Sequence, residues 1–569
     1  MLWLLFGVTL VLGEGVVEEN SNIVVIKQGP VRGYKVAGTN VFAYHNIPYA
    51  TAPTGPNKFK APLPPPEWTE VYDAIDKQVT CPQSWPTVNP KEDCLIASVF
   101  APENRTNLPV LVYVHGGAFQ IGSGNYATKF GINSISELIV VNFNYRLGVH
   151  GFLCLGTKEA PGNAGMKDQL ALLRWVHDNI AAFGGNADDV TIMGCSAGGA
   201  SVDLLRLASV TEGLFKKVIA ESGANAGAFG IQHNPIENAK YYAKALGFEN
   251  IDDLSALSNF YTSASLETLF SRSDLVSNRP DSSVIFAPCV EKDIGIEMFL
   301  DDAPVNILKS GSNNAHPVLY GFANLEGVMR LGHFQNWSMR MNENFSEFLP
   351  ADLAFENVEE KEAVAKRVKE FYFGDKPVSP DTIQAYVDYF SDTLFVYSIL
   401  RSVKLSTESG NNSTIYLYEY SFADINSIAL PGGMTGALHC DQIQASFDRN
   451  EIFFTEERRN IMAKMRRMYS DFITTGSPVS EDSLLPPWSP TNANRDPYMA
   501  MGVNISVQGP LYEERANLWD DIYGKYYRAP IPPGNSAKIL SINKLLWIMY
   551  IIVLIPNLSV LLRKATITI

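Results

Sequence analysis

Ser196 lies in a pattern that is typical of a serine nucleophile. The run 194–198 reads Gly-Cys-Ser-Ala-Gly, follows four residues of β character at 190–193 and precedes a helix-compatible stretch at 200–207. A strand, a sharp turn and a helix form a nucleophile elbow, in which glycines two residues before and after the serine let the backbone turn tightly. Because the pattern is short, its interpretation depends on whether the chain also supplies a base, an acid and an oxyanion hole.

A carboxylate and a histidine follow Ser196 in the order that such an elbow requires. Glu326 comes after the apolar strand expected at 317–321, and His439 lies on a glycine-bearing loop further on. His333 lies in a polar stretch that is typical of solvated surface. The sequence therefore predicts a triad in which His439 takes the proton of Ser196 and Glu326 holds the imidazole.

A candidate oxyanion hole follows another expected strand. The apolar segment 110–114 leads into Gly116 and Gly117, where the backbone can approach a substrate closely. Acyl transfer needs preorganised N–H groups for the negative charge of its transition state. We expect these groups from Gly116, Gly117 and Ala197, and this chemistry implies no metal or cofactor.

The elements that must position these residues predict an α/β fold. Continuous apolar segments, typical of strands buried on both faces, occur at 110–114, 138–142, 190–193, 217–220 and 317–321. A helix is expected over 165–183, and residues 231–310 and 330–412 are expected to cover the sheet. We therefore predict a large, mostly parallel central sheet with helices on both faces, in one domain over 22–527.

Composition limits the possible partners. The chain has 569 residues, 46% of them hydrophobic, and a net charge of −15. Without a basic surface for phosphates, the chain is not expected to bind nucleic acid.

The N-terminus predicts entry into the secretory pathway. Residues 1–15 are apolar and then small and acidic, as in a signal peptide. The sequons expected to carry glycans are at Asn104, Asn336, Asn344, Asn411, Asn412 and Asn504.

The C-terminus predicts a membrane anchor. Residues 528–543 are rich in proline and glycine, as in a stalk, and the apolar segment 545–562 is followed by Arg563 and Lys564. Eighteen helical residues span about 27 Å, so we expect a single-pass protein at the cell surface or on the lumenal side of a membrane, with a short cytosolic tail. The alternative is a GPI-anchor signal, because small residues begin at Asn535.

Several motifs resemble the type B carboxylesterase and cholinesterase family of α/β-hydrolases, from about residue 23 to 519. The matching segments read Asn-Ile-Pro-Tyr-Ala at 46–50, Glu-Asp-Cys-Leu at 92–95, His-Gly-Gly at 115–117, Asn-Tyr-Arg-Leu-Gly at 144–148 and Gly-Asn-Ala-Gly-Met-Lys-Asp-Gln at 162–169. The resemblance implies the same triad and oxyanion hole. It also implies two buried ion pairs, Arg146 with Asp168 and Lys58 with Glu92, with lysine at 58 where the family usually has arginine.

The cysteines depart from the family pattern. Cys81 and Cys94 are expected to form a disulfide around a short loop. The family usually has a carboxylate before the nucleophile and glycine after the histidine, where this chain has Cys195 and Cys440. These two thiols are expected to be in contact or bonded. Because Phe248 stands where the family has a cysteine, Cys154 and Cys289 are expected to be buried free thiols.

The resemblance also suggests a substrate pocket. Phe229, Ser282 and Val284 align with the acyl pocket of cholinesterases, where the two smaller residues suggest more room, and Trp85 could match the tryptophan that stacks on choline or be a lid residue. Loss of the carboxylate at 195 favours neutral esters. We therefore expect a carboxylic ester hydrolase acting on neutral esters, with a cholinesterase or an inactive cholinesterase-like adhesion protein as alternatives and the oligomeric state left open.

Overall fold

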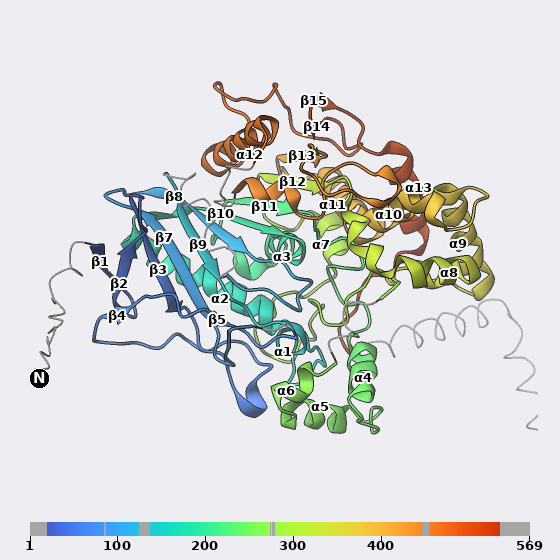
Figure 1. Cartoon of the computed structure of the whole chain (residues 1–569). Coiled ribbons are helices and arrows are strands. Elements are labelled where there is room, and N and C mark those ends of the chain that lie inside the picture. Colours follow the sequence, from blue (N-terminus) through green and yellow to red (C-terminus); the bar gives the residue numbers. More distant parts are fainter. Residues whose placement is uncertain are drawn as a thin grey trace, which may run out of the picture.

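The computed structural model describes residues 20–534 except 85–86, 125–136, 273–274, 276–278 and 447–453. A 13-stranded sheet forms its centre, with strands in the order β1-β2-β3-β7-β9-β8-β10-β11-β12-β13-β14-β15 and β4 paired with β2 (Figure 1). The strands are β1 Ser21–Ile26, β2 Gly29–Lys35, β3 Val41–Pro48, β4 Tyr72–Asp73, β7 Ile96–Pro102, β8 Leu108–Val114, β9 Ile139–Phe143, β10 Gly185–Cys195, β11 Lys217–Glu221, β12 Val318–Ala323, β13 Ile415–Tyr420, β14 Tyr498–Met501 and β15 Ile505–Gln508, while β5 Val79–Thr80 and β6 Asn89–Pro90 pair separately.

The consecutive strands β9-β8-β10-β11-β12-β13-β14 are parallel to one another. On one side of this run β1, β2, β3, β7 and β9 pair antiparallel in succession, and on the other side β15 is antiparallel to β14. Parallel strands need crossover connections, which the helices provide. The helices are α1 Gly148–Phe152, α2 Ala164–Asn179, α3 Ala197–Leu205, α4 Pro235–Ala245, α5 Leu254–Ser263, α6 Leu266–Phe270, α7 Pro304–Ser310, α8 Phe334–Glu343, α9 Val358–Phe373, α10 Ile383–Ser391, α11 Tyr397–Glu408, α12 Glu456–Thr475 and α13 Glu513–Tyr526. The prediction of a mostly parallel, helix-covered sheet is confirmed.

Two hydrophobic cores lie on opposite faces of this sheet. Successive side chains of a strand point to opposite faces. Val110, Val112 and Val114 of β8 belong to the core that includes α2 and α3, whereas Leu111 and Tyr113 belong to the core that includes α12. Figure 1 shows α12 on the other side of the sheet from α2. The central strands are therefore apolar along their whole length because both of their faces are buried.

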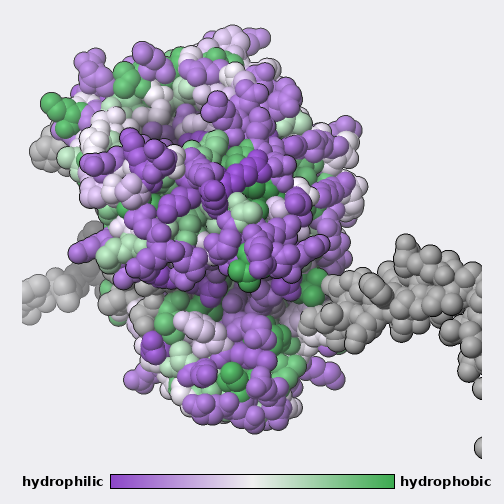
Figure 2. Space-filling model, turned by 90° about the vertical axis from the view of Figure 1, so that its right-hand side faces the viewer, coloured by the Kyte–Doolittle hydropathy of each residue, from purple (hydrophilic) through white to green (hydrophobic). Residues whose placement is uncertain are grey.

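The face of the molecule drawn in Figure 2 is largely polar, in keeping with the net charge of −15. Figure 2 shows mostly hydrophilic residues on the face in view, with hydrophobic residues in separate small groups. Among the described residues, no helix is long and apolar enough to cross a membrane. The expected signal peptide at 1–15 and the apolar segment 545–562 lie outside the described residues.

The first part of the expected stalk packs on the body. The Arg528 amide donates to the Asp352 carbonyl at 2.9 Å, and Pro530 and Pro533 are buried. Residues 535–543 of that stretch lie outside the part of the chain that the structure describes.

The expectation that Cys154 and Cys289 are free thiols is wrong. They form a disulfide across a sequence separation of 135 residues. Gly162 leaves the space for this bond, because a Cβ there would lie 2.8 Å from one sulfur and 2.9 Å from the other. The structure also contains a disulfide between Cys81 and Cys94.

Arg146 and Asp168 form a fully buried ion pair that joins α2 to the segment after β9. Nε and Nη2 of the guanidinium contact the two carboxylate oxygens at 2.8 and 2.6 Å, and Nη1 donates to the carbonyls of Lys58 and Lys60. The fork geometry satisfies both partners, as a buried pair requires.

The pair expected between Lys58 and Glu92 is not formed. The Lys58 ammonium instead donates to the carbonyls of Thr262 and Ala264, at 2.7 and 2.9 Å. These carbonyls belong to the C-terminal end of α5, where unpaired carbonyls and the helix dipole favour a cation.

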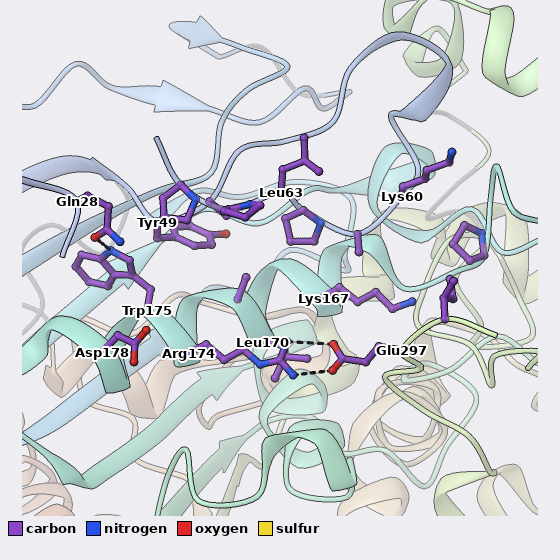
Figure 3. A pocket seen from close by; sticks show the side chains of 18 of the residues that line it. Gln28, Tyr49, Lys60, Leu63, Lys167, Leu170, Arg174, Trp175, Asp178 and Glu297 are labelled. Carbon is purple, nitrogen blue, oxygen red and sulfur yellow. Dashed lines mark hydrogen bonds and ion pairs between the residues drawn. The ribbon is translucent and has the colours of Figure 1, made fainter. Parts of the chain in front are cut away.

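We expect Asp168→Asn to lower the free energy of unfolding by about 3–5 kcal/mol, because a buried guanidinium would lose its counter-charge. The matched control is Glu297→Gln. Figure 3 shows Glu297 facing Arg174 across two contacts, and these side chains are 52% and 47% exposed, so their fork should contribute only about 0–1 kcal/mol. Urea denaturation of both variants measures the difference, and equal losses would contradict it.

Candidate active site

Ser196 sits in a strained turn at the carboxyl end of β10. Its φ of 62° and ψ of −125° are unusual for a residue with a side chain, and its amide donates to the Glu221 carbonyl at 2.9 Å. A Cβ at Gly198 would lie 2.1 Å from the Val114 carbonyl oxygen, and one at Gly194 would lie 2.4 Å from Gly198. The two glycines of the motif are therefore required by close backbone contacts on both sides of the serine.

His439 contacts Glu326, so the structure brings together two residues that are 113 positions apart. Nδ1 of His439 is hydrogen-bonded to Oε2 of Glu326, whose side chain is fully buried and whose other oxygen accepts the Ala323 amide at 2.8 Å. A neutral imidazole that donates through Nδ1 has an unprotonated Nε2. This Nε2 atom is buried and makes no hydrogen bond within the described residues, so it is available to accept a proton.

The expected oxyanion-hole residues lie next to the elbow. A Cβ at Gly116 would lie 3.1 Å from the Ser196 Cβ and 2.5 Å from the Cys195 carbonyl oxygen. Gly117 has a φ of 115°, which favours glycine. Ala197 is the first residue of α3, where N–H groups have no partner inside the helix.

A disulfide joins the residue before the nucleophile to the residue after the histidine. Cys195 and Cys440 are bonded, with their Cα atoms 6.2 Å apart. Cys195 is buried, and Cys440 has a φ of 65°.

A second buried carboxylate, Glu221, was not among the predicted site residues. It ends β11, pairs in register with Cys195 and is fully buried. Its carboxylate accepts the hydroxyls of Tyr418 at 2.7 Å and Tyr469 at 3.2 Å and the amide of Gln442 at 3.0 Å. The only signal in the sequence is a glutamate that directly follows an apolar strand.

Burial controls the ionisation of Glu221. It raises the pKa of this carboxyl to about 7, although the three hydrogen bonds act in the opposite direction, and the nearby charge of Glu326 raises the pKa further. Within the described residues no cation is paired with Glu221. Its protonation state therefore changes near neutral pH.

Aromatic side chains lie beside the histidine. Phe395 stacks on His439 with ring centroids 4.2 Å apart, and Phe229 meets Phe395 edge to face at 4.9 Å. Val284 is buried, and Ser282 is also buried and donates to the Thr393 hydroxyl at 3.0 Å. Trp85 lies outside the described residues.

A cavity of about 900 Å³ lies between α2 and the proline-rich loop 61–65, and none of the triad residues lines it (Figure 3). Two of its charged lining residues, Lys167 and Arg174, are paired with Glu291 and Glu297. Because its lining also includes none of Gly116, Gly117 and Ala197, this cavity is separate from the candidate active site. Among the described residues, no group of three His, Cys, Asp or Glu side chains could hold a metal ion.

The comparisons with known proteins agree with this geometry. Residues 20–519 match the model of the Carboxylesterase family. Venom carboxylesterase-6 of Apis mellifera is 30% identical over 82% of this chain and 87% of its own, and carboxylesterase 5A of Canis lupus familiaris is 30% identical over 91% of each.

Solved structures are also similar. Juvenile hormone esterase from Manduca sexta, with OTFP covalently attached, superposes with a TM-score of 0.78 at 26% identity, over 89% of this chain and all of the other. A thermophilic pNB esterase superposes with a TM-score of 0.70 at 26% identity, over 87% of this chain and 99% of the other. The resemblance predicted from the motifs is confirmed: the chain belongs to the carboxylesterase family and is a carboxylic ester hydrolase.

Proposed function

We propose that the protein hydrolyses neutral carboxylic esters through a serine acyl-enzyme. The observation that carries this proposal is the hydrogen bond between His439 Nδ1 and a fully buried Glu326, together with an Nε2 atom that has no hydrogen-bond partner in the described part of the chain. A histidine in this state is the general base that a serine nucleophile requires.

In the proposed mechanism, Ser196 Oγ attacks the ester carbonyl while His439 Nε2 takes its proton. The N–H groups of Gly116, Gly117 and Ala197 stabilise the oxyanion. Collapse of the tetrahedral intermediate releases the alcohol, which receives its proton from His439. Water then attacks the acyl-enzyme, with the same imidazole as base, and releases the carboxylic acid and the free serine. None of these steps needs a metal or cofactor.

The preference for neutral esters rests on charge and on the lining near the histidine. Position 195 is a cysteine bonded within the protein, so it offers no negative charge to a cationic alcohol group. Phe229 and Phe395, which lie beside His439, are buried and apolar. Glu221 is fully buried and is covered by its three hydrogen-bond donors, so its charge is not presented at a surface.

We further propose that the enzyme works in the secretory pathway, held at a membrane by its C-terminal segment and carrying glycans. The three disulfides suit an oxidising compartment. Five of the six sequon asparagines are exposed, and Asn411 is half-buried.

We expect Ser196→Ala to lower kcat/KM on a 4-nitrophenyl ester by about 10⁴–10⁶-fold, because the nucleophile is lost while the fold remains. Ser209→Ala, at an exposed serine, is the matched control and should keep wild-type activity. Equal, slow hydrolysis by the wild type and Ser196→Ala would instead favour the adhesion-protein alternative.

A second measurement compares kcat/KM for a choline ester and a neutral ester with the same acyl group. Because position 195 carries no negative charge, we expect kcat/KM for the choline ester to be no higher than that for the neutral ester. A strong preference for the choline ester would contradict the neutral-ester proposal and favour a cholinesterase.

Glu221 also predicts a pH dependence of stability. Its pKa is about 7 in the folded protein and 4.5 when free, so the folded state binds the extra proton between these values. The stability that it contributes is present below about pH 4.5 and is lost as the pH rises through 7, a change of about 3 kcal/mol. Glu221→Gln keeps an acceptor oxygen but cannot ionise.

The free energy of unfolding of Glu221→Gln relative to the wild type should therefore increase by up to about 3 kcal/mol from about pH 5 to pH 8. Denaturation at the two pH values measures this difference. Glu237→Gln, at a side chain that is 69% exposed, is the control and should show little change. A difference that is independent of pH for Glu221→Gln would contradict the burial argument.

A further inference from the structure

The position of His439 is not set by regular secondary structure. The histidine lies between β13, which ends at Tyr420, and a 3₁₀ turn over Asp441–Ser446. This stretch of some twenty residues contains one other regular element, the short turn Pro431–Gly433. A general base must stay within hydrogen-bond reach of its nucleophile. Individual bonds must therefore hold this imidazole in place.

One set of bonds attaches the histidine segment to the acid side of the site. The Leu325 amide donates to the Ala437 carbonyl at 3.1 Å, and the Ala437 amide donates to the Asn324 side chain at 2.8 Å. Together with the contact between His439 and Glu326, these bonds fix the segment relative to the end of β12. They do not by themselves fix its distance from Ser196.

The attachment to the nucleophile side consists of the Cys195–Cys440 disulfide and the bonds of Gln442. The disulfide joins the direct neighbours of Ser196 and His439. Gln442 adds hydrogen bonds to Glu221 and to the Ser222 hydroxyl, at 3.0 and 2.7 Å. The disulfide is the only covalent link between the elbow and the histidine segment within the described residues.

The backbone conformation at Cys440 is unfavourable for a residue with a side chain. Its φ of 65° lies in the left-handed region, which glycine adopts freely and a residue with a Cβ does not. A cysteine here has an unfavourable backbone conformation that the rest of the structure must hold. Cys195 is 1% exposed, so the bond lies inside the protein rather than on its surface.

We propose that the Cys195–Cys440 disulfide is a positioning element of the active site, which holds His439 Nε2 at the distance from Ser196 Oγ that proton transfer needs. This inference rests on the proposed serine mechanism. The other two disulfides, Cys81–Cys94 and Cys154–Cys289, include no neighbour of a triad residue. Only the site disulfide should therefore affect the chemical step.

The test compares two double variants that each remove one disulfide. Cys195→Ala/Cys440→Gly opens the site disulfide and also relieves the backbone strain at 440, and Cys154→Ala/Cys289→Ala is the control. Both should lower the thermal midpoint, since each loses a cross-link over more than one hundred residues.

Only the site variant should lose about 10–100-fold in kcat on a 4-nitrophenyl ester, with KM changed less than about threefold, because a small displacement of a catalytic group costs up to two orders of magnitude. The rate at which a fluorophosphonate modifies Ser196 should fall in parallel, since that reaction needs the same base. A kcat equal to that of the control variant would overturn the proposal.

Two further measurements separate this proposal from the function that it rests on. Wild-type hydrolysis that does not depend on Ser196 would refute the proposed mechanism itself. If the site variant does not fold, the wild type is treated with graded dithiothreitol, and activity is plotted against thiol labelling of Cys195 by mass spectrometry. Loss of kcat in proportion to labelling supports the positioning role of the disulfide, and full activity of the labelled protein overturns it.

Discussion

The close approach of backbone segments around Ser196 is the constraint on which the rest of the structure depends. The turn is possible because Gly194, Gly198 and Gly223 leave no side chain between neighbouring chains, and a Cβ at Gly223 would lie 2.2 Å from the Ser196 carbonyl oxygen. The parallel strands β8, β10 and β11 end at the same edge, so this packing also brings Gly116 beside the serine. The sharp turn at Ser196 and the position of the expected oxyanion hole are thus consequences of one tightly packed sheet edge.

The packed edge of the sheet fixes the positions of residues at the strand ends. Glu326 and His439 come instead from the connections that follow strands. Glu326 begins a 3₁₀ turn directly after β12, where its buried carboxylate is fixed by the amide of Ala323. His439 comes from an irregular loop and is held by contacts from several directions, including Phe395 and Cys440. Functional residues on loops are common, but they need a rigid scaffold to be placed accurately.

Most of the fold, and the contact between Glu326 and His439, could be predicted from the sequence because their signals are local or ordered. Apolar runs revealed the buried strands, and the glycine pattern around Ser196 revealed the elbow. The predictions that were wrong concern contacts between residues far apart in the sequence. Cys154 and Cys289 are 135 residues apart, and Lys58 reaches carbonyls more than 200 residues away, so neither contact leaves a local pattern. Glu221 was missed because its three hydrogen-bond donors come from β13, α12 and the turn after His439.

The register between β10 and β11 places a buried carboxylate beside Cys195. Cys195 and Glu221 are partners in adjacent strands, so a carboxylate absent from position 195 is present one strand further along. The two positions are not equivalent, however. At 221 the carboxylate is enclosed by two tyrosines and a glutamine, and burial keeps its charge away from water. A negative charge here is repelled by that of Glu326, and Gln442 links Glu221 to the segment that carries His439. It is not exposed to attract a cationic ligand. This arrangement agrees with the proposed preference for neutral esters, because the buried carboxylate at 221 does not replace the charge that position 195 lacks.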